Sequence, residues 1–444
     1  MRGDGPDRHF APGPGGTERS VASRQIFAML AIVGLAVAGA RPGLAGPLDG
    51  GGDFSDTERL RPGIYPAAPV PPDFAVPGEP GHNPLDIDWS VGLRGSFTHA
   101  TSGDSFVTTL TPQASGTYAG RRGTLAFEGS AAIARVGSSN ELALGSAAFA
   151  IDGHLALDRL TTLTGRAALE HARTLPGTPG LDPLLLQPAG ESTGTLELGV
   201  ERRFGPFKLG AEGSVARRLY GDSVRADTGT TSNADQDHWS TAARLRLGYQ
   251  MTPIFEVFGE AGLGREMFDH PSTRLGQRLD ATDRTVRAGV SGNWNDVLSA
   301  SVSVGVGERQ FDAAGLDRVT TQLYDASVTF RPTSTLALTA GLASAIAPPG
   351  SDGAGTAKIE HSAEAGADYD VNSWLRLRAS ADWTASRQVG GPETETRYGL
   401  GAGADYRVNR HTELSADYDY GHRDNSSSGT LDSHTISVGI TLRR

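Results

Sequence analysis

The 444-residue sequence contains no cysteine, so neither a disulfide framework nor a thiolate metal or redox site is available. After Ala45 it also lacks any run of about 18 or more apolar residues, which excludes a bundle of membrane-spanning helices. Positive charge is scarce, because 40 Lys and Arg stand against 51 Asp and Glu and the formal net charge is -11. A surface that binds the phosphates of DNA or RNA is therefore not expected, and no nucleic-acid partner is predicted.

The first 45 residues have the features of an export signal. Arg19 and Arg24 precede the apolar run Ile26–Ala40, and the small-residue site Gly43–Ala45 follows it. This order predicts a signal peptide at residues 1–45 that is cleaved after Ala45. The alternative is an uncleaved anchor, which is less favoured because the run is short for a membrane-spanning helix.

The rest of the chain has two parts that differ in composition and in apolar pattern. Residues 46–84 are rich in proline and glycine without a repeating apolar face, which predicts a flexible periplasmic extension. From Leu85 onward apolar residues such as Ile87, Trp89 and Val91 alternate with polar ones. A period of two indicates strands with one apolar and one polar face, and it continues to the end of the chain. Residues 85–444 are therefore predicted to form one all-β unit.

Short turns and longer connections alternate along this unit. Odd-numbered strands are followed by long connections such as 174–191 and 221–237, whereas even-numbered strands end in tight turns. The pattern predicts a transmembrane up-and-down antiparallel β-barrel of about 18 strands, with its N-terminus and short turns in the periplasm. The expected turns lie at 120–123, 158–159, 205–206, 252–253, 295–296, 332–334, 372–373 and 409–410.

Three signs favour a membrane barrel over a soluble sandwich. The apolar face extends for about ten residues on nearly every strand, which is the length that crosses a bilayer when tilted. The polar face carries many charges, which a packed soluble core would not accept but a water-filled lumen keeps solvated. Aromatic residues gather beside the short turns, as an interfacial girdle would: Tyr118, Phe204, Tyr249, Trp294, Phe330, Tyr369 and Tyr406.

The charges of the polar face are predicted to line the lumen and to pair between neighbouring strands. Arg244 and Arg246 are expected beside Glu256 and Glu260, with Arg287 on a following strand. A second group is Glu364 and Asp368, expected beside Arg376 and Arg378, with Asp382 further along the same strand. Such ladders would create a transverse field, and the alternative is that mixed charges only keep the lumen wet and the register fixed.

The wall between these two groups is predicted to be smooth, because Ser, Thr, Gly and Ala dominate its polar face, as at Ser299, Ser301, Ser303, Thr339 and Gly341.

Outward parity places five arginines just beyond the apolar band. A guanidinium group binds phosphate through two hydrogen bonds, so these side chains are candidates for lipid phosphates of the outer leaflet. The alternative is that they are ordinary solvated charges at the loop bases. The five are Arg135, Arg173, Arg217, Arg265 and Arg387.

The stretch Ser105–Pro112, leading into Gly120–Leu125, resembles the opening hairpins of the putative β-barrel porin type 2 family. The resemblance covers most of the chain from Leu85 and implies a Gram-negative outer-membrane barrel, in a family with some members associated with exopolysaccharide export. The implied partners are outer-membrane lipid, including lipopolysaccharide, and the barrel-assembly machinery. Residues 98–104 depart from the family by lacking an Asp- and Asn-rich loop, and the last strand ends on Arg443 and Arg444 rather than on an aromatic residue.

No catalytic, cofactor-binding or metal-binding residue is predicted, because none of the scattered histidines sits in a nucleophile motif and Gly399–Gly403 has no helix after it. Barrels of 16–18 strands generally enclose an aqueous bore, so the sequence predicts a passive channel for small hydrophilic solutes, not an enzyme. The alternatives are a structural or adhesion barrel with a plugged bore and an accessory pore for exopolysaccharide export. Inward aromatics would favour sugar passage, but they are few, with Phe258 and Trp374 among them. The sequence does not fix the solute or the oligomeric state.

Overall fold

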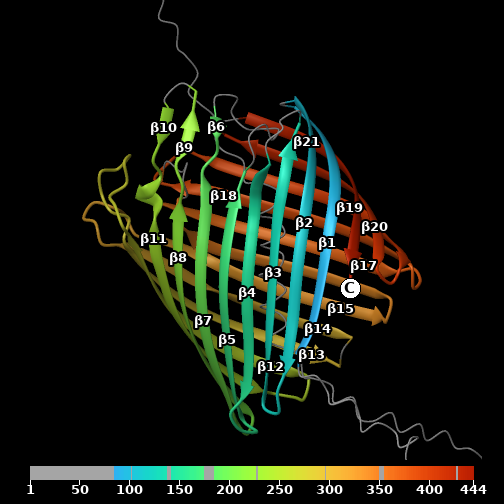
Figure 1. The fold of residues 1–444 in the computed structure, drawn as a ribbon. Coiled ribbons are helices and arrows are strands. Elements are labelled where there is room, and N and C mark those ends of the chain that lie inside the picture. The colour runs from blue at the N-terminus through green and yellow to red at the C-terminus, as the bar shows by residue number, and fades with distance from the viewer. Residues whose placement is uncertain are drawn as a thin grey trace, which may run out of the picture.

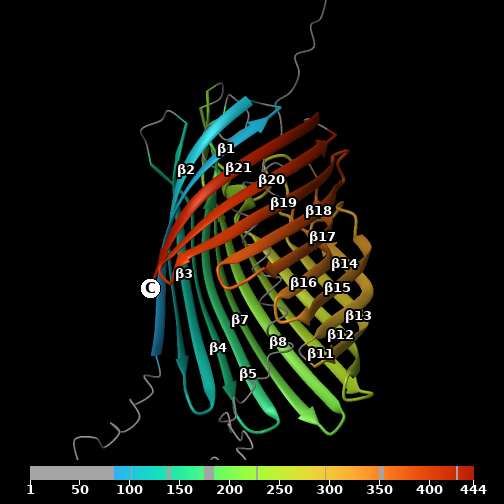
Figure 2. The same cartoon turned by 90° about the vertical axis from the view of Figure 1, so that its right-hand side faces the viewer.

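The computed structural model describes residues 85–444 except 102, 138–141, 175–184, 227–228, 296, 350–354 and 427–428. The predicted signal peptide and the extension at 46–84 lie outside the described residues. One 18-stranded antiparallel sheet closes on itself, because the first strand pairs with the last (Figures 1 and 2). The predicted fold class and strand number are therefore confirmed.

The barrel strands follow one another around the wall in sequence order. They are β1 (Leu85–Ala100), β2 (Gly103–Ala119), β3 (Gly123–Val136), β4 (Ala143–Ala156), β5 (Thr161–Arg173), β7 (Gly190–Phe204), β8 (Phe207–Tyr220), β11 (His238–Gln250), β12 (Phe255–Phe268), β13 (Ala281–Trp294), β14 (Leu298–Phe311), β15 (Val319–Thr333), β16 (Leu336–Ala347), β17 (Ala357–Asp370), β18 (Leu375–Val389), β19 (Thr394–Asn409), β20 (Thr412–Asn425) and β21 (Gly429–Arg443). A small sheet of β6 (Leu185–Gln187), β9 (Ser223–Arg225) and β10 (Gly229–Thr231) lies above one end (Figure 1), and Ala234–Gln236 forms a 3-10 turn.

The two faces of the wall have opposite polarity, as β14 illustrates. Val302, Val304 and Val306 point outward and are 52%, 55% and 51% exposed. Ser301 and Ser303 alternate with them and face the interior. Exposing this many valines to water would be unfavourable, whereas hydrocarbon accepts them. The outer face is therefore the lipid-facing surface.

The predicted short turns all join consecutive strands at one end of the barrel, which we call the short-turn rim. Only residue 296 of these turns lies outside the described residues. Side chains that accept backbone bonds set the tightest of them. The Asp158 carboxylate accepts from the amides of Leu160 and Thr161 at 2.7 and 2.8 Å, and the Asn372 side chain accepts from those of Trp374 and Leu375 at 3.0 and 2.9 Å.

The opposite end, the long-loop rim, departs from the predicted strict alternation. Its connections at 101–102, 390–393 and 426–428 are as short as the turns, so the expectation of a long connection was wrong there. The reason is that the strands stay paired to their ends, as at Ala100 with Gly103 and Asn425 with Gly429. Gly103 and Gly429 have φ angles of 129° and 78°, which only glycine adopts without strain. From β18 through β21 to β2, the strands are therefore joined at this rim by short connections instead of long loops.

An aromatic girdle surrounds the short-turn rim. The predicted aromatic residues end their strands beside the turns and are exposed on the outer face, with Tyr249 packed on Phe207 at 5.1 Å between ring centroids. Trp374 belongs to this girdle, because its ring meets Tyr406 edge-on at 5.3 Å. Its predicted inward orientation is thus wrong: it lies in the turn before β18, where strand parity no longer applies.

The two-sided wall predicts opposite outcomes for the same charge on adjacent residues. We expect Val302→Arg to lower the free energy of unfolding by about 2–4 kcal/mol, because it places a cation in hydrocarbon. Ser301→Arg, its neighbour on the lumen face, should change stability by less than about 1 kcal/mol. Denaturant titration of the barrel folded in lipid vesicles measures both; equal losses for the two variants would contradict the assignment of faces.

Candidate functional site

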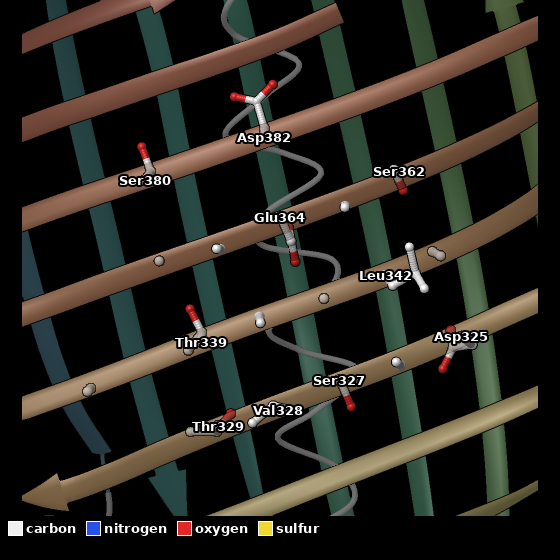
Figure 3. A pocket seen from close by; sticks show the side chains of 18 of the residues that line it. Asp325, Ser327, Val328, Thr329, Thr339, Leu342, Ser362, Glu364, Ser380 and Asp382 are labelled. Atoms are coloured by element: carbon white, nitrogen blue, oxygen red, sulfur yellow. The ribbon is translucent and has the colours of Figure 1, made fainter. Parts of the chain in front are cut away.

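The interior holds a cavity of about 3450 Å³, lined by inward residues from strands all around the wall. Its lining includes Pro206, Pro253 and Asn295 in the turns at one rim and Pro349 and Glu393 in connections at the other. Among the described residues the cavity thus extends from the short-turn rim to the long-loop rim. Figure 3 shows part of its wall, on β15–β18. Nine of the ten predicted lumen residues line it: Arg244, Arg246, Glu256, Glu260, Arg287, Glu364, Asp368, Arg378 and Asp382.

The first predicted ladder is assembled on β8, β11 and β12. Arg246 donates to Glu256 at 3.0 Å, and Lys208 from β8 reaches the other oxygen of the same carboxylate at 3.0 Å. Arg244 meets Glu260 at 3.3 Å. Glu256 lies against the wall over Gly248, where an added Cβ would be 2.6 Å from its carboxylate. A carboxylate between two cations is held in one place, so this part of the wall is rigid and its charges are largely compensated.

An inward aromatic residue packs against the same ladder. Phe258 is 5% exposed because its ring covers Gly289 on β13, and the Arg246 guanidinium stacks on the ring at 3.5 Å. A side chain at position 289 would collide with this ring at 2.6 Å. Gly289 therefore leaves room for the Phe258 ring. The stacking holds Arg246 against the wall rather than in the bore.

A second network crosses the place where the barrel closes. Arg378 of β18 contacts Asp405 of β19 at 2.8 Å and Asp417 of β20 at 2.7 Å, and Arg94 of β1 contacts Asp417 at 3.1 Å. Gly403 leaves the space for this crossing, since a Cβ there would be 2.3 Å from Asp417. Lumen ion pairs thus join the last strands of the chain to the first.

In the second ladder Asp368 and Arg378 are register partners, as predicted. The ion pairs of Arg378, however, are with Asp405 and Asp417 on β19 and β20. Arg376 donates to Asp370 at 2.7 Å at the short-turn rim, and it is not among the residues that line the cavity. Glu364 is instead the register partner of Asp382, but its carboxylate lies over Gly341 of β16 while that of Asp382 points the other way (Figure 3). Strand parity could not select a partner for Arg378, because acidic residues stand on the strands to both sides of it.

Hydroxyl groups surround these carboxylates. Ser327, Thr339 and Ser380 share the lumen face of β15–β18 with Glu364 and Asp382 (Figure 3). Asp325 also lies on this wall, and Arg287 approaches it at 3.9 Å across β14, where Gly305 leaves room. The smooth wall predicted between the ladders is present, with Asp325 and Arg331 of β15 as charges that the prediction omitted.

The five outward arginines have three different environments. Arg135 and Arg387 are exposed on the outer face near the long-loop rim. Arg217 forms a two-bond ion pair with Asp269, and Arg265 forms one with Asp312. These two pairs, which we call the rim clasps, each span an intervening strand.

Arg173 lines the cavity, contrary to its predicted outward position. It is the last residue of β5, where the chain leaves the ladder, and its Nε donates to the Pro188 carbonyl at 3.1 Å.

A buried ion cluster near the long-loop rim was not predicted. Arg309 is 2% exposed and binds Asp283 and Glu266, each at 2.8 Å. The connections 221–237 and 269–280 are held together beside it by Asp235, whose carboxylate accepts from the Thr273 amide and hydroxyl at 2.8 Å. Extending the inward parity of β14 as far as Arg309 would have found the cation, although not its burial.

Across the described part of the chain, no helix is long and apolar enough to span a membrane. Within the same residues, no group of three or more His, Asp or Glu side chains is arranged to hold a metal ion.

A closed antiparallel barrel with an apolar outer face and a charged lumen defines a class, the porin-like outer-membrane β-barrels. The chain belongs to one family of that class, because the family model described as "Putative beta-barrel porin 2" matches residues 95–444. The resemblance noted from the first hairpins is therefore confirmed, as is the outer-membrane location. No curated protein matches the chain.

Three solved structures are among those similar to the chain, and one of them, OpdK, is described as an outer membrane protein. The Pseudomonas aeruginosa protein OpdK is 12% identical, with 81% of this chain and 99% of that chain covered and a TM-score of 0.41. OccK3 (OpdO) of the same organism is 14% identical, with 81% and 96% covered and a TM-score of 0.40. Acinetobacter baumannii OccAB4 is 12% identical, with 81% and 98% covered and a TM-score of 0.42.

The rim clasps predict a pH-dependent contribution to stability. Hydrogen bonds from Arg265 hold the pKa of Asp312 below its usual value. The clasp should therefore stabilise the fold fully above the usual pKa of about 3.9 and lose this contribution as pH falls through the lowered value. Asp312→Asn should be less stable than the wild type at pH 7, and this deficit should shrink as the pH is lowered to 2.

Denaturant titration at both pH values measures this difference. Asp317→Asn, a change of the same kind in the same connection, serves as control and should match the wild type throughout. A deficit of Asp312→Asn that is unchanged at pH 2 would contradict the ionic origin of the clasp.

Proposed function

We propose that the barrel is a passive channel for small hydrophilic solutes, which cross the outer membrane through its mixed-charge lumen. The observation that carries this proposal is the cavity that reaches turns at one rim and connections at the other. Its charges are fixed to the wall by pairs such as Arg246 with Glu256, so they keep the bore wet without filling it. No catalytic role is assigned to any residue.

The proposal includes an orientation and a route of export. Residues 1–45 direct secretion and are removed after Ala45, and residues 46–84 form a periplasmic extension. The short-turn rim then faces the periplasm and the long-loop rim faces the outside, as short turns do in barrels of this class. The barrel-assembly machinery inserts the chain, with β21 as the closing strand.

The arrangement of lumen charge supports a preference among solutes. Glu364 of β17 and Asp382 of β18 are register partners, so two carboxylates lie on neighbouring strands of the lumen wall. Negative charge is therefore concentrated on this part of β17 and β18. A pore with such an arc admits cations more readily than anions, because mobile cations concentrate beside it.

Planar-bilayer recordings test both statements. The wild type should conduct KCl in steps, and the double variant Glu364→Gln with Asp382→Asn should lower the cation-to-anion permeability ratio by about twofold. Glu308→Gln removes a carboxylate from the outer face and should leave the ratio unchanged. Absence of conductance in correctly folded protein would contradict the channel and favour a plugged barrel with a structural or adhesive role.

We also propose that Arg135 and Arg387 bind phosphate groups of lipopolysaccharide, since both are exposed on the outer face beyond the apolar band. Arg217 and Arg265 would have to release their clasp aspartates to do the same. Changing Arg135 and Arg387 to Gln should lower the unfolding temperature in lipopolysaccharide but not in neutral detergent. Arg331→Gln, on the lumen face, is the control, and equal shifts in the two media would remove the proposal.

A further inference from the structure

The ladder between β15 and β16 stops well below the long-loop rim. β15 begins at Val319 and β16 ends at Ala347, yet the first rung between them joins Asp325 to Ala343. Neither Val319–Tyr324 nor Ser344–Ala347 has a register partner on the other strand. The flanking ladders continue to the strand ends, where Arg309 pairs with Val319 and Ala347 pairs with Lys358. The gap is therefore a local separation of two well-formed strands.

The last rung ends in a side-chain cap. The Tyr324 amide donates to the Ser344 hydroxyl at 2.5 Å, and that hydroxyl donates to the Tyr324 carbonyl at 3.2 Å. Ser344 is 5% exposed, so its hydroxyl occupies the place that a backbone partner would otherwise take. The amide and carbonyl of Tyr324 at the end of the ladder therefore both have hydrogen-bond partners, which keeps the paired strands below from separating.

Above the cap, apolar side chains take the place of hydrogen bonds. Phe311 and Val319 belong to the same apolar cluster as Ile359 of β17, and Leu316 and Ile346 pack against it. In water such a cluster would hold the two sides firmly together. In a membrane it is a weak closure, because lipid tails solvate these side chains as well as they solvate one another. Opening of the β15–β16 seam therefore breaks no rung of the backbone ladder.

The lumen beside the seam is polar. Asp325 lies on the first rung, and Ser327 and Ser362 stand near it on the wall, whereas Leu342 lies on β16 between these strands (Figure 3). Carboxylates and hydroxyls bind hydroxyl-rich groups, and the apolar seam accepts an acyl chain. An amphiphile with a hydroxyl-rich head and an acyl chain would contact the polar lumen wall with its head and the apolar seam with its chain, which points toward the lipid.

We infer that the β15–β16 seam is a lateral exit through which single-chain amphiphiles with hydroxyl-rich heads pass from the lumen into the leaflet at the long-loop rim. This rests on the proposed aqueous lumen, which delivers the molecule to the seam. Hydrophilic solutes without a chain continue along the bore, so the two routes share an entrance and differ in their exit.

Bridging the seam tests the inference, and the absence of native cysteine makes the chemistry specific. The pair Leu323→Cys with Ala345→Cys, joined by a short bis-maleimide, locks the strands above the cap. Ser301→Cys with Ser327→Cys, joined in the same way across the intact β14–β15 ladder, is the matched control. Mass spectrometry establishes complete bridging, and the probe is a fluorescent decyl glucoside.

Entry of the probe into the membrane of proteoliposomes that contain lipopolysaccharide is measured beside KCl conductance. The locked variant should transfer the probe at least tenfold more slowly than the control, with conductance unchanged. Ser344→Ala loosens the cap and should speed transfer severalfold, a result that does not depend on the double variant folding. Unaltered transfer in both variants, with conductance intact, would overturn the lateral exit, whereas loss of conductance in the wild type would overturn the channel itself.

Discussion

Backbone hydrogen bonding in a medium without water is the constraint on which this structure depends. Every amide and carbonyl within the hydrocarbon needs a partner from the chain, and an antiparallel sheet that closes β1 on β21 supplies it without leaving an edge. Closure then fixes side-chain direction, so alternate residues meet lipid and the lumen. The exception is the β15–β16 seam, which begins below the long-loop rim and at whose lower end the Ser344 hydroxyl bonds to the Tyr324 backbone.

Glycine residues determine where the large side chains of the lumen lie against the wall. Glu256 lies over Gly248, Phe258 lies over Gly289, and the contact between Arg378 and Asp417 crosses Gly403. In each case a neighbouring strand lacks a side chain at the point where a large one must lie flat. The wall thereby carries many charged groups without filling the bore.

The period of two was enough to predict the closed barrel, its strand number, its turns and the inward position of most charged residues. Partner choice was harder to predict, because parity selects a face but not a direction. Arg378 bonds to Asp405 and Asp417 rather than to the acids of β17. Strand ends were harder still. Arg173 and Trp374 are not on their expected faces, because the chain leaves the ladder there. The alternation of polar and apolar residues also does not indicate how far the ladder between β15 and β16 extends.

A cysteine scan of β14 tests the central claim of two solvents on two faces most directly. Single cysteines at 299, 301, 302 and 304, in barrels embedded in lipid vesicles, are exposed to a charged thiol reagent that does not enter membranes. We predict rapid modification at 299 and 301, which line the lumen, and protection at 302 and 304, which face outward. Equal reactivity at consecutive positions would contradict a wall with lipid on one side and water on the other.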